Sequence, residues 1–268
     1  MKLNPIIPQR KKLQDQLWDF VQPNSTHQID LELENQEDIY YNECCYNLPI
    51  EAYTTPSLHL LCLLVKERLH VTENVIFQVD NREFITGSSS VSGNNKYPSV
   101  VSLSAGAINT LNEKELSFLI GHELGHVISR DGLVRFFFSK LPHQAKVPED
   151  IHHAMHVLDL LAELEADRYG YLACNSDMDA FVSFMWQMSG GIDIHKFGVS
   201  TSTYLKANLS HVQKFLNGGW LGKRHPANAL RIEAIRLFAT SKTNYVLREQ
   251  MEPIIDSIFE CDDDDDQV

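Results

Sequence analysis

Apolar residues recur at helical spacing along most of the second half of the chain. Between Leu116 and Val127 they fall on one side of a helix, and Asn112 precedes them as an N-cap with Glu115 at the capping-box position. The pattern therefore predicts a helix that begins just after Asn112. Further helices are predicted at residues 133–140, 150–174, 180–188, 203–215, 227–240 and 244–258.

The segment before Asn112 combines one helix with short strands. Residues 57–69 predict a buried helix, and residues 87–98, which are rich in Ser, Gly and Asn, predict a loop. Strands are predicted at residues 74–80, 84–86 and 99–104. The last of these fits either the edge of a sheet, where its backbone could hold an extended peptide, or the sheet interior. Together the elements predict an α+β fold, dominated by helices, with a small sheet packed over the helix that follows Asn112.

The two ends of the chain differ in composition from this region. Residues 1–55 are mixed and polar, with one helix predicted at residues 11–20, and we expect them to form an N-terminal extension with a regulatory role. The main domain is expected at residues 56–258. Residues 259–268 contain a run of aspartates, which predicts a disordered and solubilising acidic tail.

Composition and charge narrow the class of protein. With 268 residues, of which 43% are hydrophobic, the chain can bury a single large core. A formal net charge of -13 disfavours binding to nucleic acids or to anionic membrane surfaces.

The longest apolar runs, at residues 60–65 and 134–138, are far shorter than the ~20 residues of a membrane-spanning helix, and the start of the chain has no secretory pattern. We therefore expect a soluble, cytoplasmic protein whose five cysteines, which have neither disulfide nor zinc-site spacing, stay reduced.

The strongest chemical signal lies inside the helix predicted to begin just after Asn112. His122 and His126 are four residues apart and share one face, so both imidazoles can reach one metal ion. Glu123 lies beside them, where its carboxylate can bind a zinc-held water whose pKa is lowered to about 7. This H-E-x-x-H pattern predicts a hydrolase with one Zn2+ per chain. Gly121 and Gly125 each weaken a helix by about 1 kcal/mol relative to Ala, which indicates close packing of another backbone here.

A zinc hydrolase needs a third protein ligand as well as an open fourth position. The run after His126 does not continue as H-x-x-G-x-x-H, so this ligand must come from another element. Glu163, in the helix predicted at residues 150–174, is the best candidate. Asp167 shares its face four residues later and can accept a hydrogen bond from a ligand histidine. Glu165 points about 200° away from Glu163 around the helix, which predicts a solvated charge.

Three histidines compete with Glu163 for the role of third ligand. His152, His153 and His156 lie in the same predicted helix, and His156 falls on the face of Glu163, seven residues before it. Because histidines near a helix start often bind no metal, we expect this cluster to lie beside the site or on the surface. Glu163 therefore remains the predicted ligand.

Three motifs follow one another along the chain, namely His122-Glu123-Leu124-Gly125-His126, Glu163-Leu164-Glu165-Ala166-Asp167, and Arg224-His225-Pro226 with Arg231 a few residues beyond. In this order they resemble peptidase family forty-eight of the metallopeptidases, the gluzincins that include HtpX-like and CAAX-prenyl-protease-like enzymes. The resemblance covers about residues 56 to 240. It implies that His122, His126 and Glu163 bind zinc. It also implies that Glu123 is the general base, that His225 stabilises the oxyanion, and that Arg231 orients the site through a carboxylate.

The resemblance thus implies a zinc-dependent endopeptidase with a gluzincin-type fold, whose metallopeptidase domain we expect at residues 56–258. The best-known members of the family are integral membrane proteins, but the short apolar runs of this chain predict a soluble form. Its expected substrate is an unfolded or extended polypeptide. Two alternatives stay open. One is a latent or catalytically silent zinc-bearing protein of the same fold, with a binding or regulatory role. In such a protein, residues 1–55 would plug the cleft. The other is a zinc hydrolase that acts on amides other than peptides.

Overall fold

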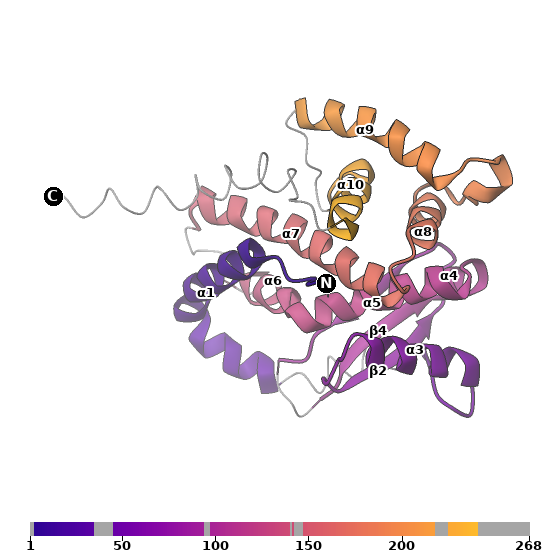
Figure 1. The fold of residues 1–268 in the computed structure, drawn as a ribbon. Coiled ribbons are helices and arrows are strands. Elements are labelled where there is room, and N and C mark those ends of the chain that lie inside the picture. Colours follow the sequence, from indigo (N-terminus) through magenta and orange to yellow (C-terminus); the bar gives the residue numbers. More distant parts are fainter. Residues whose placement is uncertain are drawn as a thin grey trace.

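The computed structural model describes residues 3–34, 45–93, 97–139, 141, 147–217 and 225–240 (Figure 1). Its helices are α1 (Pro8–Glu34), α3 (Pro56–Arg68), α4 (Ala105–Thr110), α5 (Glu113–Ser129), α6 (Asp131–Ser139), α7 (Glu149–Ala173), α8 (Met178–Gly190), the short 3-10 helix η1 (Ile194–Phe197), α9 (Thr201–Asn217) and α10 (Asn228–Ala239). Its strands are β1 (Leu48–Pro49), β2 (Val75–Asp80), β3 (Gly87–Ser90) and β4 (Ser99–Ser104). The predicted α+β fold, helix-dominated with a small sheet, is confirmed. The helix predicted at residues 244–258 lies outside the described residues.

The sheet has the strand order β1-β2-β4-β3, with β2 and β4 parallel and the other neighbours antiparallel. Of the two positions that the sequence left open for the strand at 99–104, the sheet interior is therefore confirmed and the edge is wrong. The edge on the side of α5 is β3, inside the segment predicted as a loop, whereas residues 84–86 form no strand. The Ser-rich sequence of β3 has no apolar alternation, and its conformation depends on pairing with β4, as in Gly87 with Leu103.

Helix α5 is the centre of the fold. The predicted capping box is confirmed, because Asn112 accepts from the backbone of Glu115 and the Glu115 carboxylate accepts from the backbone of Asn112. The close packing that the two helix glycines indicate is also confirmed. A Cβ on Gly125 would lie 2.9 Å from the Cα of Ala166 in α7, and one on Gly121 would collide with Ala173. α5 and α7 can therefore lie side by side with their backbones nearly in contact.

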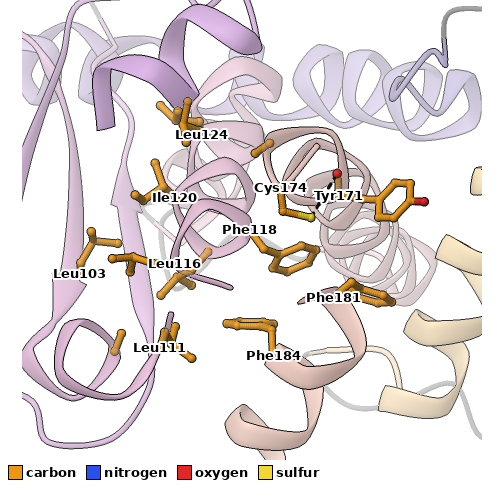
Figure 2. Close-up of a cluster of buried hydrophobic side chains, with 14 of the residues drawn as sticks. Leu103, Leu111, Leu116, Phe118, Ile120, Leu124, Tyr171, Cys174, Phe181 and Phe184 are labelled. Carbon is orange, nitrogen blue, oxygen red and sulfur yellow. Dashed lines mark hydrogen bonds between the residues drawn. The ribbon is translucent and has the colours of Figure 1, made fainter. Parts of the chain in front are cut away.

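Two hydrophobic cores flank these central helices. The first joins the sheet, α3, α5 and α8, and Figure 2 shows part of it around Phe118, with Leu103 on β4 and Phe181 and Phe184 on α8. The second lies between α1, α6 and α7, where Leu13 of α1 is 1% exposed. α7 thus runs through the middle of the molecule, between α1 and α6 on one side and α10 on the other (Figure 1).

Helix α1 is longer than the helix predicted at residues 11–20 and is well packed. Three of its apolar side chains, Leu13, Leu17 and Val21, are at most 2% exposed. Among the described residues, the free cysteines Cys62 and Cys174 are buried in the first core. Within the same residues, no helix combines the length and the hydropathy that crossing a bilayer requires.

Candidate active site

The close contact of α5 and α7 brings three side chains to one point. His122 and His126 project from α5 and Glu163 from α7, and one ligand atom of each lies within 4.8 Å of the others. The two histidine Nε2 atoms are 3.3 Å apart, and each is 3.6 Å from a carboxylate oxygen of Glu163. Two nitrogens bound tetrahedrally to one zinc ion at about 2.0–2.1 Å stand about 3.3 Å apart, so the spacing fits this ion.

Two carboxylates set the orientation of these histidines. Asp167 Oδ1 lies 3.1 Å from Nδ1 of His122, and Asp131 Oδ2 lies 3.1 Å from Nδ1 of His126. A carboxylate at Nδ1 keeps the proton of a neutral imidazole on that nitrogen and leaves a lone pair on Nε2. The two lone pairs and the Glu163 carboxylate therefore face one another as acceptors. Glu163 Oε2 is buried and lies 3.6 Å from Nε2 of His122 and 3.0 Å from Nδ1 of His225, while Oε1 lies 3.6 Å from Nε2 of His126, so two imidazoles and a carboxylate offer ligand atoms that fit a divalent cation.

Asp131 is the residue at this site that the sequence did not reveal. It is the first residue of α6, one position past Arg130, which ends α5 in the left-handed conformation with φ 54°. A residue five positions after His126 on a continuous helix would point well away from it. The turn at Arg130 brings Asp131 back to His126. A carboxylate just past a helix end, within reach of a histidine in the last turn, is the only signal that could have identified it.

Helix α10 adds a buried cation behind this arrangement. Arg231 donates hydrogen bonds of 2.7 Å and 2.6 Å to the two carboxylate oxygens of Asp167, and its guanidinium also lies 3.8 Å from Glu163 Oε2. Burial disfavours the charged form of Asp167, but the charge and hydrogen bonds of Arg231 outweigh it and lower the pKa of this carboxyl. Asp167 therefore stays ionised while it holds His122.

The electrostatics of the site favour a cation at its centre. Burial alone would lower the pKa of His126, but the carboxylates of Asp131, Glu163 and Glu123 overcome it and raise this pKa to about 10. Burial likewise opposes ionisation of Glu163, but the neighbouring His225, the two ligand-candidate histidines and Arg231 lower its pKa. The excess of carboxylates thus favours a positive charge at the centre of the cluster. A proton provides this charge when no metal is bound, and a divalent ion would provide it when bound.

A cleft of about 590 Å3 opens onto this cluster, and its lining includes His122, Glu123 and His126 of α5 together with all but the last residue of β3. Glu123 is 6% exposed. Its carboxylate lies against Gly87, since a Cβ there would be 2.7 Å from Glu123 Oε1. Two apolar side chains of α8, Phe184 and Met188, also line the cleft.

His225 also lines the cleft, just before α10. Its Nδ1 lies 3.0 Å from Glu163 Oε2, and its side chain is 63% exposed. This contact with Glu163 raises the pKa of His225. The imidazole is thus next to the ligand cluster and accessible from the cleft. Its neighbour Arg224, part of the same motif, lies outside the described residues.

The competing residues do not join the cluster. Within the described residues, the group that could hold a metal consists of His122, His126 and Glu163 and does not include His156. His152 and His153 are exposed. The prediction that Glu165 is solvated is wrong. Glu165 is 1% exposed and forms an ion pair with Arg10 of α1, because α1 covers the side of α7 on which Glu165 lies.

Comparison with known proteins agrees with this arrangement. The family model of peptidase family M48 matches residues 90–239, which include β4, α5, α7 and α10. Searches of the curated proteins and of the solved structures gave no match. The matched residues contain every side chain of the cluster described above.

Proposed function

Because the chain belongs to peptidase family M48, we propose that it is a zinc-dependent endopeptidase. In this proposal His122, His126 and Glu163 hold the ion, and Asp167 and Asp131 fix the two histidines. The proposal rests chiefly on one observation, the convergence of the Nε2 atoms of His122 and His126 and the buried carboxylate of Glu163 within 4.8 Å of one another.

Zinc bound at such a site makes a water molecule acidic at neutral pH and polarises a carbonyl group. Glu123, which is buried and lines the cleft, is the proposed general base. It accepts the proton of the attacking water and then donates it to the nitrogen of the departing amine. His225, accessible at the other side of Glu163, donates a hydrogen bond to the negative charge that develops on the carbonyl oxygen.

The proposed substrate is an extended polypeptide segment. Three of the four residues of the edge strand β3, Gly87, Ser88 and Ser89, line the cleft, and within the described residues β3 pairs with β4 alone. An edge strand can bind an extended peptide through backbone hydrogen bonds, which give affinity without a strict sequence preference. We therefore assign to β3 the binding of an extended peptide, which was expected of residues 99–104 if they formed an edge strand.

The test is cleavage of unfolded casein by the purified protein and by Glu123→Gln, with zinc measured in both. Glu113→Gln is the matched control, because Glu113 is an exposed carboxylate on the same helix. We expect cleavage by the wild type and the control but not by Glu123→Gln, at equal zinc content. Zinc in all three proteins with cleavage by none would contradict an endopeptidase and favour a latent or binding protein of the same fold.

A further inference from the structure

Helix α1 packs against α6 and α7, two helices that carry residues of the candidate active site. Of the described residues that line the cleft, none belongs to α1. Its apolar face instead packs in the second core against α6 and α7, with Leu13 and Leu17 each at most 2% exposed. A segment that plugs the cleft would place its side chains in the cleft, whereas α1 is part of the support behind the ligand helices.

A buried polar anchor fixes the start of α1 on α7. The Arg10 guanidinium lies 2.9 Å from a carboxylate oxygen of Glu165, and both side chains are at most 5% exposed. The same oxygen accepts a hydrogen bond of 2.6 Å from the backbone N–H of Ile7. Arg168, also on α7, donates to the backbone carbonyls of Pro5 and Ile6. These contacts fix the register of α1 on the helix that carries Glu163.

From this anchor, a line of hydrogen bonds leads to His126. Arg10 donates to Gln14, and Gln14 Nε2 donates to the backbone carbonyl of Ser129 at 3.0 Å. The Ser129 hydroxyl contacts Asp131 Oδ1 at 3.3 Å, and Asp131 Oδ2 lies 3.1 Å from Nδ1 of His126. Gln14 therefore holds the turn between α5 and α6 that brings Asp131 to His126.

We propose that Gln14, anchored by the Arg10–Glu165 pair, is a positioning residue for the metal centre, acting on His126 through Ser129 and Asp131. The inference rests on the proposed function, since it requires a metal ion at His126. It gives α1 the role of an integral support rather than a removable inhibitor. Groups that hold a ligand histidine through its other nitrogen contribute about 10–100-fold to metal affinity, and Gln14, two contacts further away through Ser129, contributes up to about tenfold.

The experiment compares Gln14→Met with Gln16→Met in the full-length chain. Both substitutions replace a glutamine on α1, but Gln16 is exposed whereas Gln14 contacts Ser129. The readouts are the zinc dissociation constant from chelator competition, the visible spectrum of the cobalt-substituted protein, and the thermal unfolding of the metal-free form. We expect Gln14→Met to bind zinc more weakly, by up to about tenfold, and to alter the cobalt spectrum. Gln16→Met should match the wild type in both.

A second variant isolates the hydrogen bond to Ser129. Gln14→Glu keeps the side-chain size and the acceptor for Arg10 but has no donor for the Ser129 carbonyl. We expect it to weaken zinc binding as Gln14→Met does. Wild-type affinity and an unchanged cobalt spectrum in both Gln14 variants, even with lower thermal stability, would overturn the inference and leave the proposed function intact. A wild type that binds neither metal would overturn both.

Discussion

Gly87 at the start of the edge strand lies against the carboxylate of Glu123, close enough that a Cβ at position 87 would stand 2.7 Å from Oε1. The proposed general base and the strand proposed to bind substrate are therefore in direct contact. Because position 87 has no side chain, the Glu123 carboxylate has room to lie against the strand. The proposed roles of the two residues therefore depend on each other.

Gly87→Ala should consequently impair catalysis more than folding. The added methyl group displaces the flexible Glu123 carboxylate, and a shift of about 1 Å in a reacting group can lower turnover by about 100-fold. Gly132→Ala is the control, because position 132 also lines the cleft but a Cβ there would lie 4.0 Å from its nearest neighbour, a side-chain atom of Val91. Measurement of kcat on casein and of thermal unfolding tests the idea. Equal kcat in the two variants would contradict it.

Glu163→Gln should lose zinc, because a neutral amide replaces the charged oxygen that faces the two histidines. We expect metal affinity to fall by more than about tenfold. Zinc content after dialysis against a chelator is the measurement. Glu149→Gln serves as the control, since Glu149 is an exposed carboxylate on the same helix. Full zinc content in Glu163→Gln would place the third ligand elsewhere.

Asp131→Asn should weaken zinc binding although Asp131 is not itself a proposed ligand. The substitution keeps the shape of the side chain but removes the charge that holds the Nδ1 proton of His126. A loss of about 10–100-fold in affinity is expected, measured by chelator competition. Asp150→Asn, an exposed aspartate in the first turn of α7, should have no effect. If both variants bind zinc like the wild type, the contact has no role in metal binding.

His225→Phe should lower kcat while zinc content stays near the wild-type level. His225 contacts Glu163 but is mostly exposed to the cleft, so its loss removes a donor for the developing oxyanion rather than a ligand. Removal of one such donor lowers turnover by about 100- to 1,000-fold. Steady-state kinetics with zinc analysis on the same samples separates these effects. Unchanged turnover would exclude His225 from the mechanism.

Glu165→Gln should destabilise the fold, because it leaves the buried Arg10 without its anionic partner. Loss of one member of a buried ion pair costs about 3–5 kcal/mol, whereas an exposed substitution such as Glu149→Gln changes stability by less than about 0.5 kcal/mol. Urea unfolding measures both. The double variant Arg10→Met with Glu165→Gln should lose less than the sum of the single losses, since the two groups interact directly. Strict additivity would mean that the pair contributes nothing.

The sequence determined the features of this site that depend on local geometry. Residues four apart on a helix share a face, so the spacing of His122 and His126, and that of Glu163 and Asp167, already placed each pair together. The capping box at Asn112 likewise follows from neighbouring residues alone. Glycine at position 125 indicated a close helix contact, because only a missing side chain allows one there.

The tertiary structure decided what depends on residues far apart in the chain. Glu165 is buried only because Arg10, from the N-terminal helix α1, pairs with it. β3 is a strand because β4 lies beside it, and Asp131 reaches His126 only through the turn at Arg130. Helical periodicity reports which face a residue occupies but not what covers that face. The burial of a charge and the edge of a sheet are set by the packing partner, which no local pattern encodes.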